Sequence, residues 1–120
     1  MKKLEKLFEP GIIGKMELKN RIVMSPMGTA AHNPDSSLRD NVADYYAERA
    51  KGGVGLIMGQ TSTILPESAA PYRTGTWDDK FIPGLRMVAD AIHQYDTKCA
   101  FQLTHHGRLL THYKIGRAHV

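Results

Sequence analysis

The run Val54-Gly55-Leu56-Ile57-Met58 is the stretch that decides the fold of this 120-residue chain. It is almost wholly apolar and short, and a pair of glycines stands directly before it at positions 52 and 53. Strands that are apolar on both faces are typical of parallel sheets with helices packed against them. The run therefore predicts a buried strand in an α/β fold.

The segment before this strand has the pattern of a helix. We expect a helix near Leu38 to Lys51, capped by Ser36 or Ser37 and ended by the two glycines. The residues that share one face at three-to-four residue spacing are Val42, Tyr45, Tyr46 and Arg49. A helix that leads directly into a buried strand is half of a β-α-β unit.

Further upstream, the residues from Arg21 to Met24 predict another strand. Pro26 has no backbone N–H group and should end the hydrogen-bonded pairing of this strand. Before it, the alternation of Ile13, Met16 and Leu18 around Gly14-Lys15 predicts a short hairpin.

Downstream, we expect a loop from Ser62 to Trp77 and then a second helix, capped by Asp78 or Asp79, with Pro83 in its first turn. A third strand spans Cys99 to Leu103. The predicted order is thus a hairpin followed by β-α-β-α-β, with right-handed crossovers.

Each predicted strand ends in polar or small residues. Ser25 follows the first, Gln60 and Thr61 follow the second, and Gln102 lies at the end of the third, before Thr104 and His105. The carboxyl ends of parallel strands share one edge of a sheet, and ligands bind there in α/β folds. We expect the binding site at this edge.

Two folds share this element order. A dinucleotide-binding Rossmann unit requires a glycine-rich turn after its first strand, and nothing of that kind follows Met24. A β/α barrel has no such requirement and draws single residues from many strand ends. The barrel is therefore favoured.

Composition narrows the class of protein only modestly. The formal charge is +4, but basic and acidic residues are interspersed, so we expect no nucleic-acid partner. The sequence contains neither a run long enough for a membrane span nor an apolar signal segment, and we expect a cytoplasmic protein. The single cysteine, Cys99, is expected to be a buried thiol.

Four ordered motifs resemble the Old Yellow Enzyme family, in particular the branch with bacterial NADH:flavin oxidoreductases, enoate reductases and 2,4-dienoyl-CoA reductases. The motifs are Leu7-Phe8-Glu9-Pro10, Leu18 to Met27 (LKNRIVMSPM), Tyr45 to Ile57 (YYAERAKGGVGLI) and Gln102 to Arg108 (QLTHHGR). The resemblance implies the amino-terminal part of a (β/α)8 TIM barrel, with the hairpin, about three parallel strands and two helices.

The resemblance also implies FMN as cofactor, NADH or NADPH as hydride donor, and a small-molecule substrate with an activated C=C bond: an enoate, an enone or a dienoyl thioester. By position, Pro26, Met27 and Gly28 match the segment whose backbone lies beside the flavin, and Gln102 matches the glutamine that bonds its pyrimidine edge. Thr61 stands where relatives carry a small residue under the cofactor.

Catalytic and metal residues are not expected in this chain. His105 and His106 are adjacent on a predicted strand end, so they point to opposite faces and cannot readily share an ion. In the resembling family, the residues that anchor the substrate and donate the proton lie on a later strand.

The chain of 120 residues is too short for a whole β/α barrel, which takes about 250 residues. We expect residues 1–114 to form a partial FMN-binding TIM-barrel domain and residues 115–120 (IGRAHV) to be a non-native tail that matches a translated sequencing adaptor. The isolated chain is expected to be poorly soluble and to bind FMN weakly, whereas the full-length protein could form a homo-oligomer. The rival hypothesis is a small α/β module that binds a metabolite or a protein without catalysis.

Overall fold

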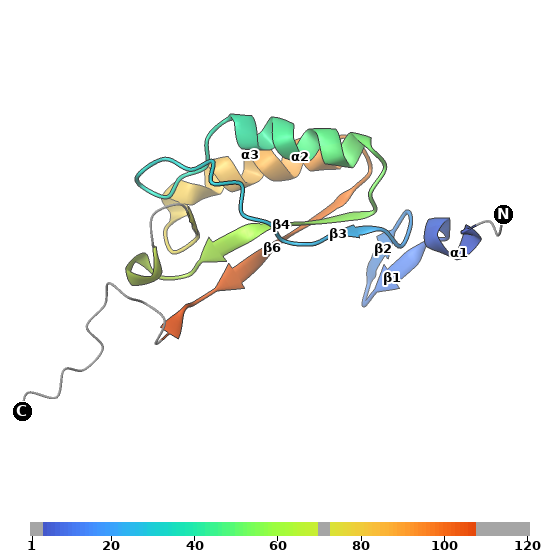
Figure 1. The fold of residues 1–120 in the computed structure, drawn as a ribbon, viewed down its shortest axis with the longest axis horizontal. Helices are drawn as coiled ribbons and strands as arrows, with labels where there is room; N and C mark the ends of the chain where they lie inside the picture. The colour runs from blue at the N-terminus through green and yellow to red at the C-terminus, as the bar shows by residue number, and fades with distance from the viewer. Residues whose placement is uncertain (1–3, 70–72, 108–120) are drawn as a thin grey trace, which may run out of the picture.

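The computed structural model describes residues 4–69 and 73–107 (Figure 1). A hairpin at the amino-terminal end is followed by parallel strands alternating with helices. The elements are α1 (Glu5–Phe8), β1 (Gly11–Ile13), β2 (Met16–Leu18), β3 (Val23–Met24), α2 (Asn41–Lys51), β4 (Leu56–Thr63), η1 (Pro66–Ser68), β5 (Thr74–Gly75), η2 (Asp79–Phe81), α3 (Ile82–His93) and β6 (Lys98–Thr104).

The predicted hairpin is confirmed. Strands β1 and β2 pair antiparallel, with Gly11 opposite Leu18 and Ile13 opposite Met16. Gly14 adopts φ +61° in the turn between them, a conformation that glycine enters at little cost.

A parallel sheet forms the centre of the structure. Strand β4 pairs with β3 through Val23–Leu56 and Met24–Ile57, and with β6 from Leu56–Lys98 to Thr63–Thr104. The short strand β5 extends the sheet by pairing with the end of β4. The predicted parallel α/β arrangement is confirmed.

The predicted limits of two strands were wrong. The first strand was expected from Arg21, but β3 comprises only Val23 and Met24, and Arg21 lies 3.3 Å from Glu9 in an ion pair. The second was expected to end at Met58, whereas β4 runs to Thr63 because its polar second half pairs with β6 and is largely buried. The expected loop from Ser62 therefore starts too early, and it also contains β5.

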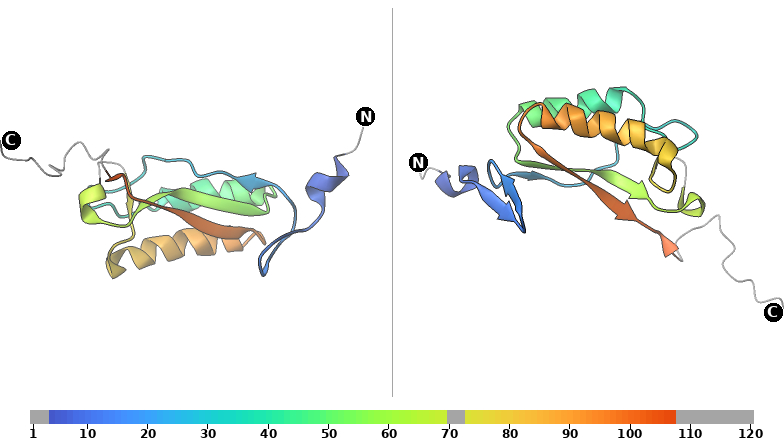
Figure 2. Two further views of the ribbon diagram at one scale, coloured as in Figure 1. Left: turned by 90° about the horizontal axis from the view of Figure 1, so that it is seen from below. Right: turned by 180° about the vertical axis from the view of Figure 1, so that it is seen from behind.

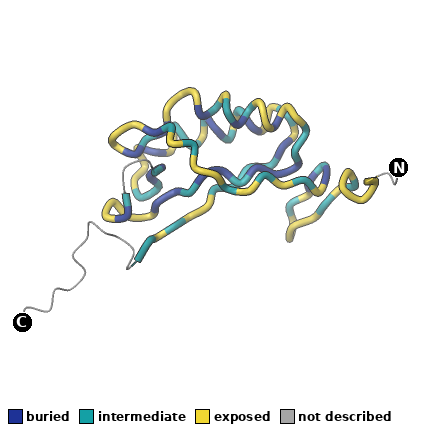
Figure 3. The backbone as a smooth tube through the Cα atoms, in the orientation of Figure 1, coloured by how far each residue is buried: buried dark blue, intermediate teal, exposed yellow. Residues whose placement is uncertain are grey.

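Both long helices pack on the same side of the parallel strands, as the views of Figure 2 show. The buried residues between helices and sheet form one cluster: Leu38, Val42, Tyr46, Ala50, Ile57, Val88 and Ile92. Within the described ranges, the opposite side of β4 and β6 is covered by no helix, and much of β6 is half-buried or exposed (Figure 3).

The start of α2 corrects another prediction. The helix begins at Asn41 with Asp40 as N-cap, not near Leu38 after Ser36 or Ser37. The Ser37 backbone and hydroxyl instead bond the Asp35 carboxylate at 3.0 and 2.7 Å, which makes a local turn, and Ser36 is left-handed at φ +70°.

The face of α2 was predicted only in part. Val42 and Tyr46 are buried, but Arg49 is exposed, and its guanidinium lies 3.5 Å from the centre of the Tyr45 ring. Gly52 ends the helix as expected.

The start of the second long helix, α3, lies closer to its predicted position than the start of α2 does. The Asp78 side chain accepts a hydrogen bond from the Lys80 backbone at 2.9 Å and caps η2, which leads directly into α3. Pro83 stands in the first turn of α3. None of the helices in the described ranges has the length and apolar character needed to cross a bilayer.

Candidate functional site

Two polar side chains meet near the carboxyl ends of the central strands. Thr61 of β4 and Gln102 of β6 are register partners, and the Thr61 hydroxyl donates a 2.9 Å hydrogen bond to Gln102 Oε1. Both strands run in the same direction in Figure 1, so the two tips share one end of the sheet. The predicted neighbourhood of Thr61 and Gln102 is present in the structure.

These two side chains lie on the face of the sheet away from the helices. Phe101 packs against the helix-side core, and side chains alternate along a strand, so Gln102 points the opposite way. Gln102 is exposed and Thr61 is half-buried. In a β/α barrel this face is the interior of the barrel.

The segment Pro26 to Gly28 runs along the same end of the sheet. Met24 is paired with Ile57, and three residues after Pro26 the Thr29 backbone bonds the Gln60 side chain at 3.0 Å. Met27 and Gly28 are exposed, and a Cβ on Gly28 would meet no atom within 4 Å. This loop therefore leaves accessible backbone beside the strand that carries Thr61.

The side chains of Thr61 and Gln102 carry no charge. Gln102 Nε2 has no protein partner among the residues that the structure describes, so it is free to donate. The pair thus presents hydrogen-bonding groups that bear no charge.

The two histidines after β6 do not form a metal site in the structure. His105 is exposed, and its Nδ1 accepts a hydrogen bond from the Gly107 backbone at 3.1 Å. No cluster of three or more His, Cys, Asp or Glu suited to an ion occurs in residues 4–69 and 73–107. Arg108 and the tail 115–120 lie outside the described residues.

The role of Gln60 was not predicted from the sequence. It was grouped with Thr61 as a polar residue after the end of a strand, but it lies inside β4, is 1% exposed and is hydrogen-bonded through its whole amide. Its partners come from distant segments, so no local pattern could have revealed them.

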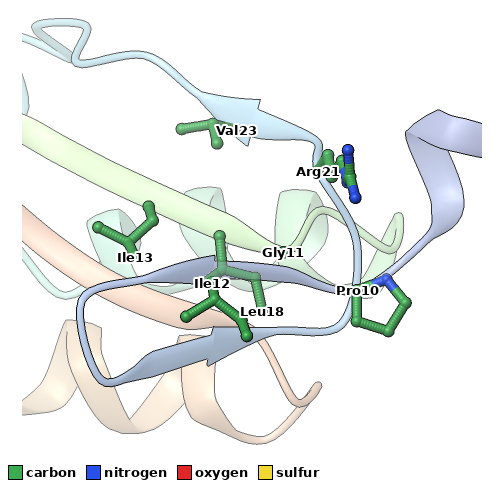
Figure 4. A pocket seen from close by; sticks show the side chains of 7 residues that line it. All are labelled: Pro10, Gly11, Ile12, Ile13, Leu18, Arg21 and Val23. Carbon is green, nitrogen blue, oxygen red and sulfur yellow. The ribbon is translucent and has the colours of Figure 1, made fainter.

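The hairpin forms a separate, partly apolar pocket of about 500 Å³ (Figure 4). It lies near the amino ends of the parallel strands, whereas Thr61 and Gln102 lie near the other end. The residues that line it are Pro10, Gly11, Ile12, Ile13, Leu18, Arg21 and Val23. We therefore do not assign the candidate site to this pocket.

Comparison with known proteins decides the family. Residues 6–117 match the NADH:flavin oxidoreductase / NADH oxidase family, which is nearly the whole chain. The chain belongs to the NADH:flavin oxidoreductase / NADH oxidase family. The resemblance to Old Yellow Enzyme proposed from four motifs is thus confirmed.

Two similar proteins show how much of a relative's length the chain covers. It is 40% identical to an NADH oxidase of Thermoanaerobacter brockii over 109 residues, which is 88% of this chain and 16% of the relative. It is 39% identical to an NADPH dehydrogenase of Halalkalibacterium halodurans over 105 residues, which is 86% of this chain and 31% of the relative. The chain spans a third or less of these relatives and matches their amino-terminal part.

Solved structures agree with this membership. The old yellow enzyme from Trypanosoma cruzi superposes with a TM-score of 0.80 at 28% identity, over 87% of this chain and 28% of the other. Morphinone reductase superposes with a TM-score of 0.76 at 35% identity, over 85% of this chain and 27% of the other. The predicted fold class, an amino-terminal portion of a TIM barrel, is confirmed.

Proposed function

We propose that this chain supplies one wall of the FMN site in a longer oxidoreductase, which uses NADH or NADPH to reduce an activated C=C bond in an enoate, enone or dienoyl thioester. The observation that carries the proposal is the Thr61–Gln102 pair, placed on the barrel-side face beside Pro26 to Gly28 in a member of a flavin oxidoreductase family. In this proposal Pro26, Met27, Gly28, Thr61 and Gln102 contact the cofactor.

The chemistry of these groups fits a flavin ring. The pyrimidine edge of an isoalloxazine offers both donor and acceptor atoms, and a carboxamide such as that of Gln102 offers one group of each kind. The absence of a side chain at Gly28 leaves space above the backbone, which lets a flat ring approach closely. The side chains of Thr61 and Gln102 are uncharged, so a neutral ring can bind beside them without burying an unpaired charge.

Each residue then has a separate task. Thr61 occupies one side of Gln102 Oε1 and so turns Nε2 toward the open face, where it can donate to the cofactor. The loop from Pro26 to Gly28 shields one side of the ring from water. Bound FMN supplies two-electron redox chemistry between the nicotinamide and the unsaturated substrate. We assign no proton transfer to the residues of this chain.

The test uses the full-length protein, by which we mean this chain together with the rest of the barrel that the proposal requires. Gln102→Ala should weaken FMN binding by roughly tenfold, because a hydrogen bond to the ring is lost. Leu103→Ala is the matched control, since Leu103 is the next residue of β6, is exposed, and points to the other face. Titration of the flavin-free protein with FMN, followed by flavin fluorescence, measures both.

Equal affinity in wild type and Gln102→Ala would contradict the assignment of this residue. A full-length protein that neither binds FMN nor oxidises NADH or NADPH would contradict the whole proposal. The non-catalytic binding module would then be the better description.

A further inference from the structure

Gln60 is an extra residue in strand β4. Gly59 pairs with Phe101 and Thr61 pairs with Gln102, so two steps along β4 match one step along β6 and Gln60 has no partner in the ladder. This arrangement is a β-bulge, a feature that often occurs beside functional sites and re-aims side chains. The bulge lies directly before the candidate cofactor residue Thr61.

The backbone of the bulge is held by a helix. The Gln60 N–H group donates a 2.8 Å hydrogen bond to the Tyr46 hydroxyl, and Tyr46 is completely buried in α2. A buried N–H group without a partner is costly, and this hydroxyl removes that cost. The position of the extra residue is thus fixed from the helix side.

The side-chain amide of Gln60 uses all of its hydrogen-bonding capacity. Oε1 accepts from the Thr29 backbone N–H at 3.0 Å and from the Thr29 hydroxyl at 2.6 Å. Nε2 donates to the Thr74 hydroxyl at 2.6 Å and lies 3.1 Å from His32 Nε2. The Thr29 N–H can only donate, so it determines which way the amide is oriented.

The loop that Gln60 contacts contains a residue in an unfavourable backbone conformation, which hydrogen bonds to a buried side chain can stabilise. Ala30 has φ +54°, a left-handed conformation that is unfavourable for alanine. The Thr29 hydroxyl also accepts a bond from the Ala31 backbone at 3.3 Å, so one side chain links the turn to Gln60. Gly28, at the exposed end of the candidate flavin wall, is the residue next to Thr29.

We propose that Gln60 is a positioning residue that holds the loop of residues 26–31 against β4, so that the backbone at Met27 and Gly28 stays beside Thr61 and Gln102. This inference rests on the proposed function, because it gives the held backbone the task of contacting FMN. Gln60 itself does not contact the cofactor. It acts from the buried side, through Thr29.

The test compares three variants of the full-length protein. Gln60→Ala removes both acceptor contacts to Thr29. Gln60→Glu keeps two acceptor oxygens for Thr29 and is the conservative rescue. Thr63→Val is the matched control, since Thr63 is a fully buried polar residue of the same strand whose hydroxyl bonds the Ser68 carbonyl instead of the loop.

The first readout is hydrogen exchange in the protein freed of flavin. Gln60→Ala should speed exchange of the Thr29 amide about tenfold relative to the core amide of Ile57, a factor that corresponds to one hydrogen bond near the upper end of its usual net value. Gln60→Glu should restore the protection, and Thr63→Val should leave the ratio unchanged. Equal acceleration at both amides would overturn the proposal, since it would indicate general destabilisation.

The second readout is FMN affinity and the visible absorption spectrum of the bound flavin. We expect Gln60→Ala to weaken binding several-fold and to shift the spectrum, and Gln60→Glu to restore both. Unchanged affinity and spectrum in Gln60→Ala would overturn the positioning role. The wild-type protein could fail to bind FMN while Gln60→Ala still selectively speeds exchange of the Thr29 amide. In that case the proposed function fails, and the anchoring of the loop by Gln60 is still supported.

Discussion

The hydroxyl of Thr61 lies 2.9 Å from Oε1 of Gln102, across two neighbouring parallel strands and on the face that the helices leave open. The contact defines the direction of the Gln102 amide before any cofactor is bound. A preoriented amide loses less side-chain freedom on binding, and this favours affinity.

Removing this contact should weaken cofactor binding. Thr61→Val keeps the shape of the side chain but deletes the hydroxyl, so we expect FMN affinity of the full-length protein to fall by roughly threefold to tenfold. Thr61→Ser keeps the hydroxyl and should bind nearly as well as wild type. Fluorescence titration with FMN measures all three, and equal values for Thr61→Val and Thr61→Ser would refute the orienting role.

The Tyr46 hydroxyl should be important for stability. Tyr46→Phe leaves the buried Gln60 N–H group without its acceptor, and we expect the free energy of unfolding to fall by about 1–3 kcal/mol. Tyr45→Phe is the control, because Tyr45 packs through its ring under Arg49 and should change stability by less than about 0.5 kcal/mol. Urea unfolding followed by far-UV circular dichroism gives both values. Similar losses in the two variants would argue against the hydrogen bond as the cause.

Gly59 should not tolerate a side chain. A Cβ at this position would lie 2.8 Å from the Phe101 ring, so Gly59→Ala should destabilise the protein by about 1–3 kcal/mol. Gly28→Ala introduces the same atom where no other atom lies within 4 Å, and its effect on stability should be small. The double variant Gly59→Ala/Phe101→Leu should recover part of the loss, and if it recovers none, the clash with the ring is not the cause.

Stability should decrease as the pH falls through the titration range of His32. Burial, and secondly the charge of Arg39, lower the pKa of this imidazole in the folded protein, so the unfolded chain binds more protons between the lowered value and about 6.5. The contribution of His32 is therefore fully present above pH 7 and is lost as the pH falls below about 6.5. Urea midpoints from pH 7.5 to 5 should show a steeper decline in wild type than in His32→Gln. Parallel curves would contradict the assignment.

Cys99 should react slowly with alkylating reagents. Burial raises the pKa of its thiol to about 11, so little thiolate exists at pH 8. Iodoacetamide labelling of the folded protein should be at least roughly tenfold slower than labelling in urea, where the pKa returns to about 8.5. Mass spectrometry of timed samples measures the rates, and equal rates would show an accessible thiol.

Apolar periodicity predicted the general organisation of this fold well. The buried run around Ile57 and the hairpin turn at Gly14 depend on residues close in sequence, and both were found as expected. Asp78 was expected to cap the second long helix, and it caps η2, the short turn that leads into α3. The start of α2 was missed because Asp35 and Ser37 form a local turn with the same side-chain chemistry as a helix cap.

The site was predictable where it depended on strand ends, and hidden where it depended on long-range pairing. Thr61 and Gln102 were expected at one edge, and the register of β4 and β6 makes them neighbours. Gln60 could not be interpreted, because a polar residue after an apolar run resembles the beginning of a loop. Its burial depends on Tyr46 and Thr74, which are each 14 residues away in the chain.

The bulge at Gln60 has an evolutionary consequence. Ile57 and Gly59 face the helix side, and the extra residue between Gly59 and Thr61 shifts the alternation of β4 by one, so that Thr61 faces the barrel side. Mutations at position 60 can alter the anchoring of the loop while the direction of Thr61 is conserved, and mutations at position 61 can do the reverse. Two adjacent codons can thus be selected independently, one for the geometry of the loop and one for the side chain on the open face of the sheet.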